Sequence, residues 1–389
     1  MRIVGVIAEY NPFHRGHAHH LAQARAVSGA DDVVVVMSGC FVQRGEAAIL
    51  SPVDRARMAL ENGADAVILL PAMWSLRDAE HFALGGVSLL NSMGCHAISF
   101  GAEDANLSRL TAAARLLEAP DAAFEAALRR HLDKGLPHPA ALSAAAEEVM
   151  PGLGALLASP NNTLAVCYLR AMMRLNAPMD AYPIPRVGSY HATTLDEPLP
   201  SATAVRGAML RGDWASALRA LPENARPILM TAAQEGRIHR PDALDLPLLY
   251  RLRMGSITPL PGVTEGIDDR LLAAVATSAD RETLLDNAKT RRYPRARLAR
   301  LCAHALLNIT QADLNATPLP PAALLLGFRQ EATPLLKHLS AGSIPLLTRA
   351  ADFPKEADWF RIERRTWDLW ALGCSLPSDM IFTQKLIRL

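Results

Sequence analysis

The hydrophobic positions of the first hundred residues form short continuous runs, separated by stretches with helical spacing. The apolar runs, which lack the alternation of half-exposed strands, are residues 2–8, 32–37, 66–70 and 97–100. Helical periodicity covers residues 52–62 and 79–92, and a glycine follows each stretch closely. Strands buried on both faces are unbroken apolar runs of this kind. The pattern therefore predicts an α/β fold with a doubly wound, Rossmann-like parallel sheet, whose ligand binds beyond the carboxyl ends of the strands.

The rest of the chain is predicted to be mainly helical. Residues 104–158 are rich in Ala and Leu with helical spacing, which indicates a helical insertion. A short strand is expected at 181–187, and helices are expected to begin near 159–162 and 201–206. From about 211 to 389 the pattern is almost wholly helical. We expect a nucleotide-binding domain over 1–210 and a second, mostly α-helical domain over 211–389.

Composition limits the class of protein. Half of the residues are hydrophobic and 20% are charged, which is typical of a globular chain. The net charge of +1 argues against general coating of nucleic acid and leaves only local basic patches. The five cysteines are scattered without a C-x-x-C spacing, so neither a zinc site nor a disulfide framework is indicated. No apolar run reaches the roughly 18 residues of a membrane helix, and we expect a soluble cytoplasmic protein.

A polar turn rich in histidine follows the first apolar run. His14, His17, His19 and His20 fall within seven positions, and Gly16 stands where the helical periodicity is about to resume. A helix start presents unpaired N–H groups and a positive dipole end, and imidazoles add further donors. This combination favours a polyphosphate ligand. The plainer interpretation is a set of solvated loop histidines, which four histidines after a buried strand make the weaker one.

Three further groups of residues could carry chemistry. Ser201 and Thr203 stand at a predicted helix start with Arg206 one turn later, which suits phosphate but also describes an ordinary capped helix. Glu9 and Glu103 are acids at strand ends, but we predict no protein-held metal site, because Mg²⁺ usually accompanies a triphosphate. Residues 289–300 hold six basic residues around Tyr293, which indicates either RNA phosphate binding with one stacking ring or a solvated helix face.

The string HRGH after the first strand resembles the H-x-G-H signature of the nucleotidyltransferase superfamily. The longer string AEYNPFHRGHAHH is similar to the tRNA(Met) cytidine acetate ligase family, whose pattern has an aliphatic residue such as valine at Ala8 and asparagine at Arg15. The resemblance continues, densely over about the first 210 residues, through residues 37–46, 100–101, 159–162, 185–186 and 201–206. It implies that ATP activates acetate and that the acetyl group goes to the wobble cytidine of elongator tRNA(Met).

The resemblance also implies roles for individual residues. His14 and His17 would be catalytic. ATP, with Mg²⁺ carried by its triphosphate, would contact Ile7, Ala8, Glu9, Tyr10, Asn11, Pro12, Phe13, His14, Arg15, Gly16, His17, Ala18, His19, His20, Gly101, Asn162, Arg186, Ser201, Thr203 and Arg206. The sequence leaves open whether Asn161 or Asn162 faces the ligand. The tRNA would contact Lys289, Arg291, Arg292, Tyr293 and Arg295, where the family has lysine at Arg291.

Two other functions stay open at this point. One is an adenylyltransferase that acts on a phosphorylated small metabolite, although such an enzyme has little use for a large helical domain with a basic strip. The other is a non-catalytic RNA-binding protein with a relic nucleotide fold. The presence of both histidines together with Arg206 argues against the second.

Overall fold

A mostly parallel sheet forms the centre of the molecule. The computed structural model describes residues 1–389 except 187–199, 256, 258 and 265. Five parallel strands lie in the order β5-β2-β1-β6-β7, with bounds β1 Ile3–Ala8, β2 Asp32–Ser38, β5 Ala66–Leu70, β6 Ala97–Ala102 and β7 Asp180–Pro185. All five predicted strands are confirmed, although residue 187 of the last lies outside the described residues. The doubly wound α/β fold is therefore confirmed.

The strand order places one crevice at the centre of the sheet. The chain runs outward from β1 through β2 to β5 and then returns to β6, which pairs with β1 on its other side. Such a reversal opens a crevice at the carboxyl ends of the two central strands, where ligands bind in open α/β sheets. The residues that follow β1 and β6 therefore meet there. A small antiparallel hairpin, β3 Phe41–Val42 and β4 Glu46–Ala47, follows β2 at the same edge.

Three strands come from the segment that was predicted to be helical. β8, Ala323–Phe328, pairs antiparallel with β5, and β9 Leu346–Leu347 and β10 Ile387–Arg388 pair with β8. The sequence of β8, ALLLGF, has no β-branched residue, so its Ala and Leu positions match helical propensity as well as a strand. The segment after residue 211 is mostly helical, as expected, yet it shares the central sheet. The boundary near residue 210 stays a prediction.

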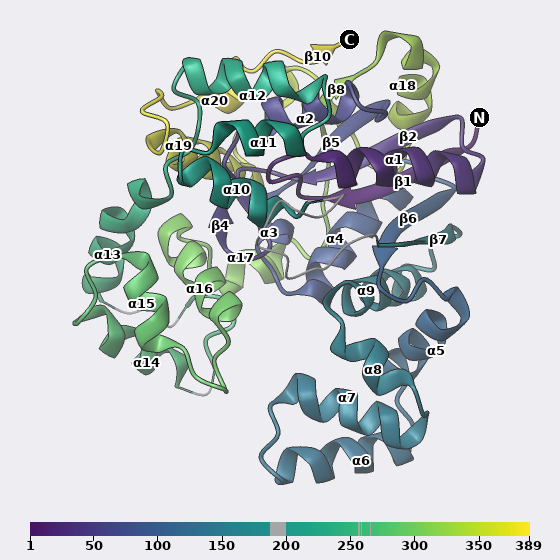
Figure 1. Cartoon of the computed structure of the whole chain (residues 1–389), viewed down its shortest axis with the longest axis vertical. Coiled ribbons are helices and arrows are strands. Elements are labelled where there is room, and N and C mark those ends of the chain that lie inside the picture. The colour runs from purple at the N-terminus through teal and green to yellow at the C-terminus, as the bar shows by residue number, and fades with distance from the viewer. Residues whose placement is uncertain (187–199, 256, 258, 265) are drawn as a thin grey trace.

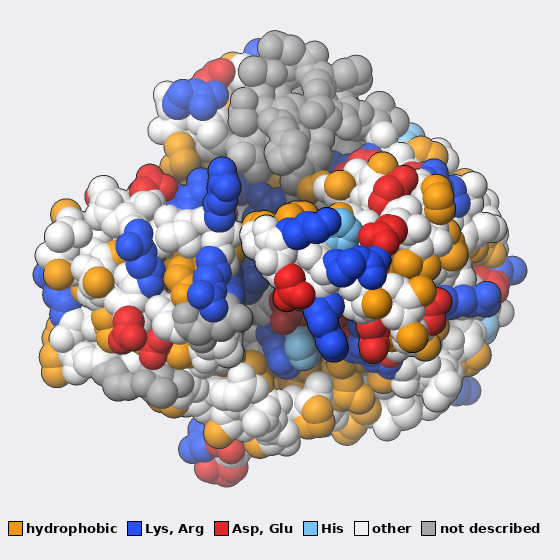
Figure 2. Space-filling view, turned by 90° about the horizontal axis from the view of Figure 1, so that it is seen from below, with side chains coloured by type: hydrophobic (Ala, Val, Ile, Leu, Met, Phe, Trp, Pro, Cys, Tyr) orange, Lys and Arg blue, Asp and Glu red, His pale blue; other side chains and the backbone are white. Residues whose placement is uncertain are grey.

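Helices cover both faces of the sheet and form two projecting groups (Figure 1). Helices α5 to α8 extend the molecule at one end, and α13 to α16 form a bundle with its own apolar core. Residues 104–158 are thus mainly helical, while their status as an insertion stays a prediction. Seen from below, the surface is hollowed between this bundle and the projecting helices, and Lys and Arg side chains border the hollow (Figure 2). The helix bounds are α1 Arg15–Ser28, α2 Pro52–Leu60, α3 Ala72–Ser75, α4 Ala79–Ser92, α5 Leu107–Glu118, α6 Ala122–Asp133, α7 His138–Val149, α8 Leu153–Ala158, α9 Pro160–Arg174, α10 Ala202–Leu210, α11 Trp214–Ala220, α12 Ala225–Gln234, α13 Asp245–Arg253, α14 Ile267–Val275, α15 Arg281–Ala288, α16 Arg295–Leu307, α17 Gln311–Ala316, α18 Thr333–Ser340, α19 Asp358–Leu372 and α20 Met380–Thr383.

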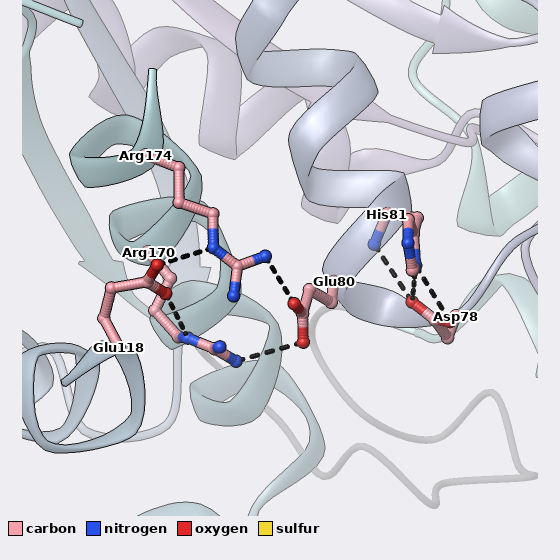
Figure 3. A network of polar contacts seen from close by, with 6 residues as sticks. All are labelled: Asp78, Glu80, His81, Glu118, Arg170 and Arg174. Carbon is pink, nitrogen blue, oxygen red and sulfur yellow. Dashed lines mark hydrogen bonds and ion pairs between the residues drawn. The ribbon is translucent and has the colours of Figure 1, made fainter. Parts of the chain in front are cut away.

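A network of four charged side chains holds α9 against α4 and α5 (Figure 3). Arg170 of α9 reaches Glu80 of α4 at 3.1 Å and Glu118 of α5 at 3.0 Å. Arg174, one turn later, contacts the same two carboxylates. Isolated surface ion pairs contribute little, but each cation here joins two helices and Arg170 is largely shielded from solvent. The network holds α4, α5 and α9 together.

Glu363 of α19 is a buried carboxyl group, and in the described structure its side-chain hydrogen bonds come from uncharged donors. Its Oε2 accepts from the Ala72 N–H at 2.7 Å, and its Oε1 accepts from the Trp367 indole N–H at 3.1 Å. Burial raises the pKa of Glu363 from 4.5 to about 7. The folded state therefore prefers the neutral acid, while the unfolded chain ionises near pH 4.5. The stabilisation that the neutral Glu363 carboxyl group contributes is therefore lost as pH rises from 4.5 to about 7.

We expect Glu363→Gln to change how stability depends on pH. Between pH 5 and pH 8 the free energy of unfolding of the wild type should fall, relative to that of the variant, by about 2 to 3 kcal/mol. Urea unfolding at several pH values measures this difference. Glu356→Gln, at an exposed glutamate just before α19, is the matched control. A difference between wild type and Glu363→Gln that stays constant with pH would contradict the expectation.

Candidate active site

The histidine turn forms the N-terminus of α1. His14 is the N-cap residue, and its Nδ1 accepts from the Gly16 N–H at 3.0 Å. His17, three residues later, accepts from the His14 N–H through its own Nδ1 at 3.2 Å. This reciprocal arrangement is a capping box made by two imidazoles. It stacks the two rings with their centroids 3.7 Å apart.

These hydrogen bonds determine which ring nitrogen carries the proton. Burial lowers the pKa of His14 to about 3, with a further contribution from Arg186, and burial also lowers the pKa of His17 well below its ordinary value. Both rings are therefore neutral near pH 7. Because each Nδ1 accepts from a backbone N–H, the proton of each ring is on Nε2. Neither Nε2 atom has a partner among the described residues, so the pair presents two N–H donors to a ligand.

The preceding residues hold the turn in place. Tyr10 has φ +49°, and its ring is buried. The centroid of this ring lies 4.7 Å from that of His17 and 4.8 Å from that of Phe13. The Tyr10 hydroxyl is buried without a partner in the described structure. Asn11 accepts from the Ile49 N–H through its side chain at 2.8 Å. Its carbonyl accepts from the Arg206 guanidinium at 2.7 Å.

This hydrogen bond between Arg206 and Asn11 connects the two sequence motifs that are predicted to bind phosphate. Ser201 is the N-cap of α10 and its hydroxyl accepts from the Ala204 N–H at 3.1 Å. Arg206 extends from α10 to the carbonyl of Asn11, and Thr203 is exposed beside it. The structure thus brings Arg206 of the second string to the turn that carries the first, although the two strings lie about 190 residues apart in sequence.

The carboxyl end of β6 supplies another wall. Gly101 lies against Arg186, since a Cβ added to Gly101 would lie 3.3 Å from the Cγ of Arg186. The positive charge of Arg186 contributes to the lowered pKa values of His14, His17 and His20, which places the guanidinium within electrostatic reach of all three. Glu103 accepts from the N–H groups of Asn161 and Asn162 and so caps α9. It is a structural acid at this position.

The two asparagines have different environments. Asn162 is 2% exposed and its side-chain oxygen accepts from the Asp104 N–H at 2.9 Å, so that oxygen holds the turn after β6. The side-chain oxygen of Asn161 lies 3.5 Å from Arg186. The contact of Asn162 with ATP stays a prediction, and the geometry favours Asn161 as the side chain that shares the space of Arg186.

Other predicted residues take supporting positions. The His20 Nε2 lies 3.3 Å from the Ser99 hydroxyl, which itself donates to the Tyr182 carbonyl, so His20 ties α1 to β6. Arg15 and His19 are exposed. Ile7, Ala8, Gly16 and Ala18 are partly buried at the strand end and first helical turn, whereas Pro12 and Phe13 are buried. Their contacts with a nucleotide stay predictions.

Glu9 and Arg55 stabilise the strand ends and the hairpin beside the site, which the sequence pattern did not indicate. Glu9 accepts from the Gln43 N–H at 2.7 Å, and burial raises its pKa, so it anchors the β3–β4 hairpin. Arg55 is fully buried and donates to the carbonyls of Glu9 at 2.6 Å and Ser38 at 3.0 Å. It thereby clamps the carboxyl ends of β1 and β2. The sequence pattern gave no signal for it, since an arginine on an amphipathic helix usually faces solvent.

The basic strip, residues 289–300, divides into exposed and engaged side chains. Lys289, Arg291 and Arg292 are exposed. Arg295 pairs with Asp286 at 2.5 Å and with Glu282, so acids of α15 already neutralise it. Tyr293 is 8% exposed and belongs to the core of the bundle. In this structure the ring packs inside the bundle, with the guanidinium groups of Arg292 and Arg297 each 5.9 Å from its centroid, and the stacking role of Tyr293 stays a prediction.

Comparison with known proteins places this geometry in context. Residues 1–380 match the family described as HIGH Nucleotidyl Transferase. The tRNA(Met) cytidine acetate ligase of Acetivibrio thermocellus is 32% identical with both chains fully covered, and that of Bacillus subtilis is 33% identical, covering 92% of this chain and 89% of its own. Thermotoga maritima TmcAL bound with alpha-thio ATP superposes with a TM-score of 0.90, and its apo form with 0.93, each at 26% identity over the whole of both chains.

The described residues contain no group of three or more His, Cys, Asp or Glu side chains that could hold a metal ion. Over the same part of the chain, every helix is too short or too polar to cross a membrane.

Proposed function

Because this chain belongs to the HIGH nucleotidyl transferase family and, within it, to the tRNA(Met) cytidine acetate ligases, we propose that it activates acetate with ATP and acetylates N4 of the wobble cytidine of elongator tRNA(Met). The observation that carries the proposal is the stacked pair of neutral histidines at the N-terminus of α1. Arg186 acts electrostatically on both rings, and Arg206 holds the carbonyl of Asn11, three residues before His14. Two N–H donors, a helix N-terminus and two guanidinium groups match a triphosphate.

In the first step a carboxylate oxygen of acetate attacks the α-phosphorus of ATP. The new O–P bond gives acetyl-adenylate, and the bond to the bridging oxygen breaks to release pyrophosphate. His14 and His17 donate their Nε2–H groups to phosphate oxygens where negative charge grows. Because the pKa of each ring is depressed, the rings act as neutral donors and transfer no proton. Mg²⁺ would enter with the triphosphate and neutralise part of its charge.

In the second step the exocyclic N4 amine of the cytidine attacks the acetyl carbonyl carbon. A C–N bond forms, the bond from that carbon to the phosphate oxygen breaks, and AMP leaves with the electron pair. The amine loses one proton to solvent. Both steps proceed without a covalent intermediate on the protein, so no nucleophilic side chain is needed at the site.

The tRNA would bind along the basic strip. Lys289, Arg291 and Arg292 are exposed on the α13–α16 bundle, which borders the hollow in Figure 2. All five cysteines are free and buried, which agrees with a reducing compartment, and we place the protein in the cytoplasm with its tRNA. An adenylyltransferase for small metabolites would leave this strip without a role.

The decisive experiment supplies the purified protein with ATP, Mg²⁺, labelled acetate and unmodified elongator tRNA(Met). After digestion of the RNA we expect labelled N4-acetylcytidine. Acetyl-coenzyme A should not replace acetate plus ATP, because the phosphate-binding groups have no function on a ready-made thioester. A tRNA with uridine at the wobble position should accept no label, since uridine carries a carbonyl in place of the amine. Label on that uridine tRNA, or pyrophosphate release only with a phosphorylated metabolite, would refute the proposal.

A further inference from the structure

The β3–β4 hairpin, residues 41–47, contacts the nucleotide site on one side. The Gln43 N–H donates to the Glu9 carboxylate at 2.7 Å, directly after β1. Glu46 lies 3.6 Å from Arg206, the guanidinium that holds the carbonyl of Asn11. The hairpin therefore contacts Glu9, which precedes the histidine turn, and Arg206, which holds that turn.

On its other side the same hairpin contacts the α13–α16 bundle. Arg281, the first residue of α15, donates to the Gly45 carbonyl at 2.9 Å, and Arg300 of α16 reaches the Gln43 carbonyl at 3.5 Å. Gly45 has φ +78°, and a Cβ there would lie 2.4 Å from the carbonyl carbon of Ala299. The turn thus rests on the backbone of α16 itself. No side chain fits between them.

The hairpin links the helices next to the basic strip with the predicted nucleotide site. The strip begins at residue 289, directly after α15, and continues into α16, so it connects the two helices that contact the turn at Gly45. A tRNA bound on the strip would be placed relative to an adenylate on the histidine turn through this contact. Misplacement of reacting groups by about 1 Å costs up to roughly 100-fold in rate.

We propose that Arg281, acting through the Gly45 carbonyl, is a positioning residue for acetyl transfer: it sets the tRNA-binding bundle at the distance from which the cytidine amine reaches acetyl-adenylate. This assignment rests on the function proposed above. In the part of the chain that the structure describes, the Arg281 side chain contacts the Gly45 carbonyl and Glu282, which belong neither to the histidine turn nor to the strip. Its loss should therefore spare adenylation and tRNA affinity and slow only the transfer. Acetyl-adenylate that waits too long is attacked by water, which returns acetate and AMP.

The test compares wild type, Arg281→Ala, Arg281→Lys and Gly45→Ala in four measurements: acetate-dependent exchange of pyrophosphate into ATP, the tRNA dissociation constant, single-turnover acetylation of tRNA, and AMP released per N4-acetylcytidine. For Arg281→Ala and Gly45→Ala we expect unchanged exchange and tRNA affinity, transfer slowed by about 10- to 100-fold, and more AMP per product. Arg281→Lys keeps a donor for the Gly45 carbonyl and should recover part of the transfer rate.

Arg253→Ala is the matched control, because Arg253 also donates to a backbone carbonyl, that of Ser278 at 3.1 Å, but within the bundle. Its transfer rate should equal that of the wild type. Equal transfer rates in wild type and Arg281→Ala, or exchange and transfer that fall together, would overturn the assignment and leave the hairpin as a structural brace. If the wild type itself forms no N4-acetylcytidine, the proposed function fails, and this assignment fails with it.

Discussion

Replacing His14 by asparagine is expected to slow acetyl-adenylate formation by about 100-fold or more while the protein stays folded. Asparagine is a good N-cap residue, and its side-chain oxygen can take the place of Nδ1 as acceptor of the Gly16 N–H. It has no group at the position of Nε2. The variant therefore removes the donor to phosphate and retains the helix cap. Acetate-dependent exchange of labelled pyrophosphate into ATP measures the rate, and thermal unfolding measures the stability.

His14→Gln provides the complementary change. Its amide can place a donor near the position of Nε2, but it loses the acceptor for the Gly16 N–H. We expect it to be less stable than the asparagine variant by about 1 kcal/mol and to adenylate faster. The reverse order of rates would show that His14 serves the helix start and not the phosphate. His17→Asn and His17→Gln apply the same comparison to the second ring.

The simultaneous replacement of Lys289, Arg291 and Arg292 by alanine is expected to weaken tRNA binding and to flatten its salt dependence. If each side chain contacts one phosphate, the log–log slope of affinity against salt should fall by about three units or somewhat less. Adenylation should persist, because these three exposed side chains belong to the α13–α16 bundle and not to the histidine turn. Filter binding or fluorescence anisotropy over a series of salt concentrations measures the slope.

The matched control for this variant removes three exposed cations from the predicted helical insertion, namely Arg115, Arg129 and Lys134. It lowers the net charge by the same amount on a different group of helices. An equal loss of affinity in both variants would show that only total charge matters and would contradict a binding role for the strip. An unchanged slope in the strip variant would identify it as an ordinary solvated face.

The crevice of this protein could be predicted from sequence because it depends on local patterns. A buried strand must be an apolar run, and the chain after it must turn, so residues 2–20 specify strand, loop and helix start by themselves. Ser201 and Arg206 were likewise recognisable as a capped helix start. The contact of Arg206 with the Asn11 carbonyl depends on tertiary packing, which the sequence pattern implies only through the fold class.

What the pattern could not reveal depends on partners that are distant in sequence or hidden. Arg295 resembles its basic neighbours in sequence, but the acids that neutralise it come from the preceding helix. Tyr293 is flanked by charged residues, yet its ring packs in the core of the bundle. Arg55 is buried because four backbone carbonyls converge on it, and no residue type records that convergence. Such environments arise from tertiary packing.

The pairing of β5 with β8 joins two strands that the ribosome synthesises at widely separated times. β5, with the sequence AVILL, emerges from the ribosome early, but its antiparallel neighbour begins only at residue 323. At ordinary translation rates that interval lasts about 10 to 50 s. During this time an apolar strand edge with no charge stays without its neighbour, which is the composition most prone to pair with other chains. Growing chains and fragments that stop before residue 323 therefore need a chaperone or a low concentration to stay monomeric.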